Sequence, residues 1–262
     1  MHKNYIILTG ASGNIGNKLA QFLLSKGYAL IMTSRNIEHL QEMQELFQEY
    51  KNNILFMELD LSDQNSIENF VKSVQNIQIK GLVNNAATDN VDKIENLNYK
   101  KLQDIISVNY VGTAYLTLLL VKNAIAKNQK LNIVNISSLL SIFGAEKSAA
   151  YSASKAALEA FARNLIVEYA DKGIVCNSIR IAGISGDLNI LGSETKVVRY
   201  DTQPKTENTK NNLQQIPAGR FSTFTEINNF IEYLLSDKSE YLNGQSINID
   251  GGISVKYPGY NI

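Results

Sequence analysis

The chain has little of the residue types on which disulfide-linked and metal-binding proteins depend. Its 262 residues include one cysteine, two histidines, three prolines and no tryptophan. The lone Cys176 excludes an internal disulfide, and its apolar neighbours predict a small buried side chain rather than a nucleophile. His2 and His39 are isolated, and no group of His, Cys and Asp has the spacing of a zinc site, so no metal site is predicted.

Neither sign of charge is in excess. Lys and Arg together number 25, and Asp and Glu together also number 25. Binders of nucleic acid or of anionic membranes need a basic surplus, so neither partner is predicted. The most apolar stretch, near residues 115–121, is far short of a membrane span, and no basic leader with an apolar segment precedes the first strand. We therefore expect a soluble, cytoplasmic protein.

Short β-rich runs alternate with amphipathic helical stretches along the whole chain. We expect strands at 5–9, 29–33, 54–58, 81–84, 131–137, 174–181 and 246–250, and helices at 14–26, 37–50, 66–76, 99–127, 149–172 and 225–236. Such alternation is typical of a parallel sheet with helices on both faces. The sequence predicts one domain over residues 1–262, a Rossmann-type, doubly wound parallel sheet of seven strands in a three-layer α/β/α arrangement.

Residues 186–215 interrupt this alternation with a polar stretch rich in Asn, Thr and Lys. A loop of this length inside a compact domain is usually functional or disordered. It leaves the carboxyl end of an expected strand, which is where open α/β sheets bind ligands. We interpret it as a substrate lid, with a surface insertion as the alternative.

A glycine-rich turn, from Thr9 to Gly16, joins the first expected strand to the first expected helix. Glycine allows a tight turn and a close approach to a pyrophosphate, and the helix N-terminus presents free N–H groups to it. The position of the turn predicts a dinucleotide site. The expected cofactor contacts in this turn are Gly10, Ser12, Asn14, Ile15 and Gly16.

The second expected strand leads into Arg35. NAD-binding proteins tend to place an acidic residue here for the ribose hydroxyl, whereas an arginine can pair with a 2′-phosphate. No Asp or Glu lies between Gly16 and Arg35, so NADP is favoured over NAD. The alternative is that Arg35 is only a surface cation.

Two further segments lie where strands three and four end. Asp60 can accept a hydrogen bond from an adenine amino group, and Leu61 follows it. Asn85 and Ala86 follow the fourth strand, where small residues allow a nucleotide to come close and the amides can hold neighbouring strands. We include all four among the expected cofactor contacts.

Tyr151 and Lys155 are four residues apart, so on a helix they share one face. The pKa of a free tyrosine is about 10, and a fixed positive charge beside it favours the phenolate. The pair therefore predicts a tuned acid/base, and Ser138 upstream supplies a hydroxyl that can polarise a carbonyl. The alternative is a solvated helix face.

Taken together, these residues resemble the short-chain dehydrogenase/reductase family over nearly the whole chain. The matching segments are Thr9–Gly16, Asp60, Asn84–Ala86, Asn109–Gly112, Ile136–Ser138, Tyr151–Lys155, and Gly244 to Gly252. The resemblance implies that Tyr151 exchanges a proton with the substrate oxygen, Lys155 lowers its pKa and holds the nicotinamide ribose, and Ser138 binds the carbonyl. It also implies that Asn109 holds a water linking Lys155 to solvent.

Three departures from the family pattern stand out. Asn14 replaces the middle glycine of the turn, and Ala87 replaces a glycine after Ala86. After strand six, residues 182–187 place Asp187 where the family has a threonine that contacts the nicotinamide. Gly183 and the backbone of Ile184 are the expected nicotinamide contacts that remain.

The leading interpretation is an NADP-dependent oxidoreductase that interconverts a small-molecule carbonyl and an alcohol. Alternatives are an enzyme modifying a sugar or nucleotide sugar, a reductase of carrier-linked 3-oxoacyl chains with Lys127, Lys130 and Lys172 as docking cations, and a non-catalytic NADP-binding regulator or scaffold. By resemblance, helices 99–127 and 149–172 pack across a two-fold axis, which predicts a homo-oligomer, a tetramer or a dimer.

Overall fold

A computed structural model describes residues 3–89, 92–185 and 215–256. Seven parallel strands form one sheet in the order β3-β2-β1-β4-β5-β6-β9. The strands are β1 (Tyr5–Leu8), β2 (Ala29–Ser34), β3 (Ile54–Glu58), β4 (Ile79–Asn84), β5 (Leu131–Ser138), β6 (Ile174–Ile181) and β9 (Ser246–Ile249). The helices are α1 (Asn14–Ser25), α2 (Ile37–Leu46), α3 (Gln64–Ser73), α4 (Tyr99–Ile106), α5 (Thr113–Ala126), α6 (Ala149–Tyr169) and α8 (Phe224–Leu235).

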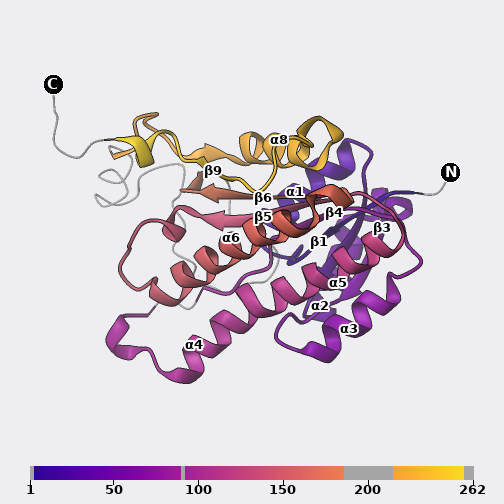
Figure 1. Ribbon diagram of the computed structural model, residues 1–262, viewed down its shortest axis with the longest axis horizontal. Coiled ribbons are helices and arrows are strands. Elements are labelled where there is room, and N and C mark those ends of the chain that lie inside the picture. The colour runs from indigo at the N-terminus through magenta and orange to yellow at the C-terminus, as the bar shows by residue number, and fades with distance from the viewer. Residues whose placement is uncertain (1–2, 90–91, 186–214, 257–262) are drawn as a thin grey trace.

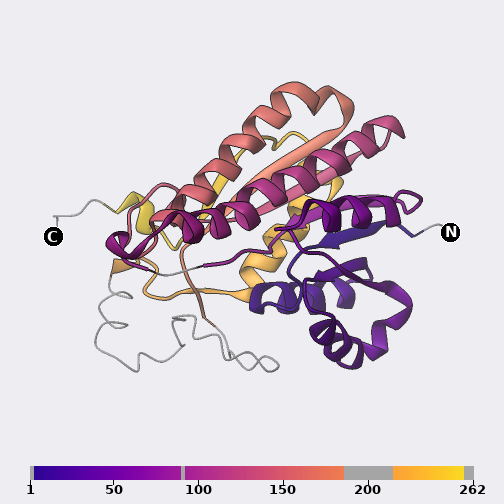
Figure 2. The ribbon, with the colours of Figure 1, turned by 90° about the horizontal axis from the view of Figure 1, so that it is seen from below.

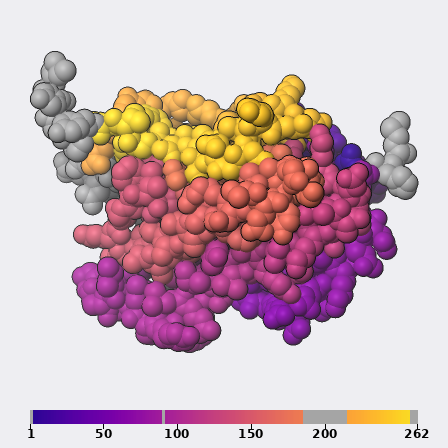
Figure 3. Space-filling view, in the orientation of Figure 1, coloured from indigo at the N-terminus to yellow at the C-terminus, as the bar shows by residue number. Residues whose placement is uncertain are grey.

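Helices cover both faces of the sheet, which gives three layers (Figures 1 and 2). Alternate residues of a strand point to opposite faces, so Ile6 packs toward α1, α2 and α8, while Ile7 packs toward α3, α5 and α6. The same alternation holds for Ile136 and Ile133 on β5. Helices α4, α5 and α6 form one broad face of the molecule (Figure 3). The predicted doubly wound, seven-stranded fold is confirmed.

Side chains cap the N-termini of four helices, whereas α1, α5 and α6 have no side-chain cap among the described residues. The caps of α2, α3, α4 and α8 are Asn36, Asp63, Asn98 and Thr223, each of which accepts a backbone N–H of the first turn. At α1 the N-cap is Gly13, and no side chain of the described residues hydrogen-bonds there. The first N–H groups of α1 therefore remain available to a ligand.

Several details differ from the expected elements. The expected helix 99–127 is α4 and α5 joined by a π-helical turn, Ser107–Gly112. A two-stranded sheet of β7 (Ile184–Ser185) and β8 (Ser222–Thr223) was not expected from the sequence. Of the expected lid, residues 186–214 lie outside the described residues.

By length and composition alone, the helical run Tyr99–Ala126 could cross a membrane, contrary to the expectation from residues 115–121. Its most apolar window is 44% buried. Leu116, Leu120 and Val121 pack with α3 and α6 in the core. This is how a core helix of an α/β domain is placed.

Candidate active site

The glycine turn lies at the point where β1 and β4 are neighbours and the strand order reverses, the usual ligand edge of such sheets. Gly10 has φ +62°, and a Cβ there would lie 2.7 Å from Cα of Ala86. A Cβ on Gly16 would lie 2.4 Å from the carbonyl oxygen of Gly10. Asn85 Nδ2 donates to the carbonyls of Thr9 and Gly10 at 2.9 and 3.0 Å. Asn85 thus fixes the turn from the neighbouring strand.

The N-terminus of α1 fits the pyrophosphate of a dinucleotide. It opens directly from the glycine turn, it has no side-chain cap among the described residues, and α1 is 12 residues long. Asn14 begins the helix, so the replacement of the middle glycine leaves the turn and the helix start intact. Its Oδ1 is buried without a hydrogen-bond partner in the described structure. The uncapped helix start is suited to an anionic group, and Oδ1 of Asn14 can accept a hydrogen bond from a hydroxyl of the ligand.

The residues expected at the adenosine end of a dinucleotide lie after β2 and β3. Ser34 is buried, and its Oγ lies 3.3 Å from Oγ of Ser12 in the glycine turn. Arg35 follows, exposed, and its side chain has no hydrogen bond or ion pair with the described residues. Asp60 Oδ1 accepts from the N–H and hydroxyl of Ser62 at 2.8 and 2.7 Å. The N-cap of α3 is Asp63 rather than Asp60, so Oδ2 of Asp60 is available to a ligand.

Leu61 supports this region through its backbone. The side chain of Leu61 is buried, and its carbonyl oxygen would lie 1.8 Å from a Cβ placed on Gly112 in the π-helical turn. Only glycine allows this contact, which packs the segment after β3 against the start of α5. Leu61 therefore contributes position rather than a reactive group.

Tyr151, Lys155 and Ser138 converge where β5 meets α6. Tyr151 and Lys155 share one face of α6, and Lys155 Nζ lies 5.6 Å from the centroid of the Tyr151 ring. Lys155 Nζ donates to the carbonyl of Ile136 at 2.7 Å, two residues before Ser138. The Ser138 hydroxyl acts on the Tyr151 phenol and lowers its pKa. The phenol, the hydroxyl and the ammonium are thus neighbours at the carboxyl end of β5.

Asn109 lies in the π-helical turn and is 1% exposed. Its Nδ2 donates to the carbonyl of Thr88 at 2.8 Å and to Oγ of Ser154 at 3.1 Å, and Oδ1 accepts from the N–H of Thr88 at 2.8 Å. Ser154 Oγ in turn donates to the carbonyl of Tyr151 at 2.6 Å. The side chain of Asn109 therefore ties the loop after β4 to the first turns of α6. The implied water between Asn109 and Lys155 stays a prediction.

The protonation of the site differs from the sequence-based expectation for Tyr151. Burial raises the pKa of Tyr151 to about 12, the charge of Asp89 raises it further, and the hydrogen bond of Ser138 opposes them. Lys155 was expected to lower this pKa, but in the structure desolvation of the phenol dominates. Burial also lowers the pKa of Lys155 to about 8, and the charge of Glu159 opposes that effect. At pH 7 the phenol and the ammonium are both protonated.

Gly183 and Ile184 lie at the start of the segment that departs from the family pattern. A Cβ on Gly183 would lie 2.6 Å from the Phe221 ring, and the Gly183 carbonyl accepts from the N–H and hydroxyl of Ser222 at 3.1 and 2.7 Å. Ile184 pairs with Ser222 in the small sheet. Asp187 lies outside the described residues.

Three charged residues of this region were missed from the sequence. Asp89 acts on Tyr151 from the loop after β4, while Glu159 and Arg180 form a buried ion pair of 2.6 Å beside Lys155. A signal for Glu159 existed: it continues the four-residue spacing of Tyr151 and Lys155 along α6. No comparable pattern marks Asp89 or Arg180.

A doubly wound sheet with a glycine turn at its switch point and a Ser, Tyr and Lys cluster beside it defines a dinucleotide-dependent oxidoreductase. A protein-family model described as enoyl-(acyl carrier protein) reductase matches residues 10–254. The chain belongs to the short-chain dehydrogenase/reductase family, as its residues predicted.

Curated relatives and solved structures agree with this assignment. The chain is 31% identical to 2-dehydro-3-deoxy-D-gluconate 5-dehydrogenase of Bacillus subtilis, over 94% of this chain and 92% of the relative. It is 29% identical to 3-oxoacyl-(acyl-carrier-protein) reductase FabG of Buchnera aphidicola, over 97% and 98%. A short chain dehydrogenase from Bacillus anthracis matches with TM-score 0.83 and 26% identity, over 97% of this chain and 98% of that one.

Proposed function

We propose that this protein is an NADP-dependent oxidoreductase that reduces a carbonyl substrate, with Tyr151 as the acid. The observation that carries the proposal is the convergence of Tyr151, Ser138 and Lys155 at the sheet edge that also holds the glycine turn. A structural role alone does not account for a half-buried phenol beside a buried ammonium, because burying a charge is costly. The named relatives above are reductases and dehydrogenases, which supports the same chemistry.

Each residue of the site has a separate role in the proposed carbonyl reduction. When bound, the nicotinamide supplies a hydride for the carbonyl carbon. Ser138 donates a hydrogen bond to the carbonyl oxygen and so stabilises the negative charge that develops on it. Tyr151 gives its phenol proton to that oxygen, and the ammonium of Lys155 then stabilises the phenolate that remains. Asn109 keeps the first turns of α6 in place through Ser154.

Substitution of Tyr151 by Phe tests the chemical step. We expect kcat with any accepted carbonyl substrate to fall by about 10²- to 10⁴-fold, the usual worth of a positioned acid, while NADPH binding persists. Tyr241→Phe is the matched control, because Tyr241 is fully exposed and its hydroxyl touches nothing in the site. Wild-type turnover in Tyr151→Phe would overturn the proposal. NADPH binding without turnover of any carbonyl by the wild type would favour the regulator or scaffold alternative.

The preference for NADP rests on Arg35, Ser12 and Ser34. The exposed guanidinium follows β2, and the two hydroxyls lie together beside it, a donor set suited to a 2′-phosphate. We expect Arg35→Ala to weaken NADPH binding by about 10-fold or more, as for loss of a charge-assisted hydrogen bond, and to change NADH binding little. Arg163→Ala, on the exposed side of α6, is the control. A fluorescence titration that finds tighter NADH than NADPH binding by the wild type contradicts the assignment.

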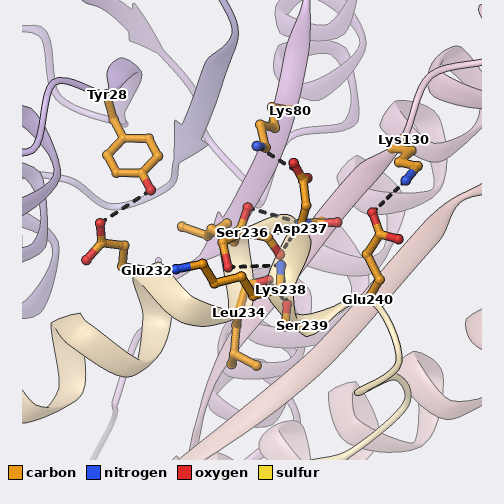
Figure 4. Close-up of polar contacts among 12 residues, drawn as sticks. Tyr28, Lys80, Lys130, Glu232, Leu234, Ser236, Asp237, Lys238, Ser239 and Glu240 are labelled. Atoms are coloured by element: carbon orange, nitrogen blue, oxygen red, sulfur yellow. Dashed lines mark hydrogen bonds and ion pairs between the residues drawn. The ribbon is translucent and has the colours of Figure 1, made fainter.

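The structure favours a small-molecule substrate over a carrier-linked one. Lys127, Lys130 and Lys172 lie at the amino ends of β5 and β6, and the eight-residue strand β5 places them about 23 Å from Ser138. Lys130 is also paired with Glu240 at 2.5 Å (Figure 4). The expected docking cations are therefore at the wrong edge of the sheet. Turnover of free carbonyl substrates without any carrier protein is the corresponding test.

Beside Ser138 the described rim of the site is apolar. Ile142 and Phe143 follow the 3-10 turn Leu139–Ser141 and are 48% and 46% exposed. A carbonyl substrate with an apolar group next to the reacting carbon would cover them. We propose this class ahead of nucleotide sugars, whose hydroxyls and phosphates this rim would leave without partners. A nucleotide sugar turned over faster than apolar ketones would reverse the order.

We also propose a homo-oligomer built on the face of α4, α5 and α6. Apolar side chains remain exposed there, among them Tyr99 at 80%, Val111 at 54% and Val167 at 86%. A second copy of the chain would cover them, as the family resemblance implies. Light scattering is expected to give a multiple of 29.1 kDa, and the monomer mass would refute the proposal.

A further inference from the structure

Glu159 is a buried carboxylate on the same face of α6 as Lys155, one turn further along the helix. It is 3% exposed. Its Oε1 accepts from the hydroxyls of Ser137 and Ser141 at 2.6 and 2.7 Å and from Arg180 Nε at 2.9 Å. Its Oε2 accepts from Arg180 Nη2 at 2.6 Å. None of the chemical roles proposed above involves Glu159.

Arg180 extends the contact across three strands. In the sheet register Ser137 of β5 lies opposite Arg180 of β6, which lies opposite Asn248 of β9. Arg180 Nη1 donates to Oδ1 of Asn248 at 3.3 Å, and Nε also donates to Oγ of Ser141 at 3.1 Å. The arginine side chain is 15% exposed, so the pair is largely shielded from solvent. One carboxylate therefore joins α6 to the carboxyl ends of β5 and β6.

The two serine contacts enclose Ser138. Ser137 precedes it on β5, and Ser141 closes the 3-10 turn that follows it, whose Leu140 N–H donates to Oγ of Ser138 at 3.2 Å. Glu159 holds both ends of this short segment against the helix that carries Tyr151 and Lys155. A shift of the segment would move Ser138 relative to the phenol.

We propose that Glu159, clamped by Arg180, is a positioning residue for the carbonyl reduction: it fixes Ser138 through Ser137 and Ser141 and places a negative charge one helical turn from Lys155. The inference rests on the proposed function for its kinetic consequences. A buried ion pair is often no more stabilising than an apolar pair of the same volume, so stability alone does not explain its presence here. The position of the pair beside Ser138 and Lys155 does explain its presence.

The electrostatic effect proposed for Glu159 involves few charged groups. The titratable or charged side chains acting on Lys155 and Tyr151 in the described structure are Glu159 on α6 and Asp89 after β4, with Arg180 on β6 paired to Glu159. Glu159 favours the protonated form of Lys155 and opposes the effect of burial. Removing only the carboxylate charge also leaves Arg180 as a second uncompensated cation. The loss of the carboxylate charge and the unpaired charge of Arg180 both lower the pKa of Lys155.

The test compares Glu159→Gln with the wild type by kinetics and by NMR. We expect kcat to fall by roughly 10- to 100-fold, the cost of misplacing a catalytic group by about 1 Å, with the KM for NADPH changed less than about 2-fold. Carbon-13 NMR of lysine labelled at Cε, with the Lys155 signal assigned by Lys155→Met, is expected to show a lower pKa for Lys155. Glu240→Gln is the matched control, because it removes the same charge from a lysine pair at the far edge of the sheet.

A second variant covers the case in which Glu159→Gln does not fold, since it leaves Arg180 buried without a partner. Glu159→Gln with Arg180→Met removes both charges. It is expected to fold, to keep NADPH binding and to show the same loss of kcat, because Ser137 and Ser141 lose the charged acceptor. Circular dichroism of each variant confirms that the fold is retained.

The outcomes separate this inference from the proposed function. If the wild type reduces carbonyls but the folded variants keep its kcat and the Lys155 titration, the positioning role is wrong and the proposed function stands. If the wild type reduces nothing, the proposed function fails, and the NMR titration still decides whether Glu159 acts on Lys155. A lowered Lys155 pKa in Glu159→Gln supports that action, and an unchanged one overturns it.

Discussion

Replacing Lys155 by Met should stabilise the folded protein at neutral pH while abolishing turnover. The pKa of Lys155 in the folded protein, about 8, lies below the ordinary value of 10.5 because the side chain is buried. A difference of about 2.5 in pKa corresponds to roughly 3 kcal/mol against the charged form. Methionine keeps the apolar stem but loses the hydrogen bond to Ile136, which costs about 1 kcal/mol. The expected net gain at pH 7 is about 2 kcal/mol.

The sign of the pH dependence follows from the same two pKa values. Below pH 8 the lysine is protonated in both the folded and the unfolded chain, so its unfavourable burial is fully present. Between pH 8 and 10.5 the unfolded chain binds the proton that the folded protein has released, so wild-type stability rises through this window. Lys155→Met lacks that rise. The advantage of the variant should therefore shrink from pH 8 upward and vanish near pH 10.

Urea unfolding followed by circular dichroism, at one protein concentration and at several pH values from 6.5 to about 10, measures this difference. Lys51→Met, at an exposed position of the 3-10 turn Gln48–Asn53, is the control and should change the free energy of unfolding by less than about 0.5 kcal/mol throughout. If Lys155→Met is less stable than the wild type at pH 7, or if its advantage does not depend on pH, the assigned cost of burying this charge is wrong.

Three further predictions concern the same site. Gly16→Ala should abolish dinucleotide binding in a fluorescence titration, because its Cβ would meet the turn's own carbonyl at 2.4 Å, whereas Gly144→Ala, with nothing within 4 Å, should bind as the wild type does. Asp89→Asn should lower the pKa of Tyr151. The Tyr151 titration is the tyrosinate absorbance of Asp89→Asn minus that of the same variant with Tyr151→Phe added. An unchanged pKa would show that the charge of Asp89 does not act on Tyr151. Carbonyl reduction should slow as pH rises through about 8, when Lys155 loses its proton, and a flat kcat profile to pH 10 would contradict this role.

The local patterns of the chain predicted most of the fold and several of the residues that meet at the carboxyl edge of the sheet. Helical spacing placed Tyr151 and Lys155 on one face, and the alternation of strands with helices placed Ser138 at the ligand edge of the sheet. Both depend on residues close in sequence. The two-stranded sheet of Ile184 and Ser222 could not be predicted in the same way, because each strand has only two residues and its partner lies across residues 186–214.

For a related reason the sequence did not predict the raised pKa of Tyr151. Sequence spacing identifies Lys155 as a neighbour, but the pKa depends on how deeply the phenol is buried and on Asp89, which arrives from another loop. Arg180 was missed because its pairing with Glu159 requires the register of β5 and β6. The sequence of one helix gives no pattern that predicts its contacts with residues on neighbouring strands.

The raised pKa of Tyr151 has a consequence for the direction of the reaction. Reduction of a carbonyl requires a protonated phenol, and with a pKa of about 12 nearly every molecule has one at pH 7. Oxidation of an alcohol requires the phenolate as the base, and burial together with Asp89 disfavours that form. The positive charge of Lys155 is needed most after the proton has left, when it faces a new phenolate in a site of low polarity. The resting protonation of the pair therefore suits the proton transfer of the proposed carbonyl reduction at pH 7, the direction that an NADPH-binding site at Arg35 would serve.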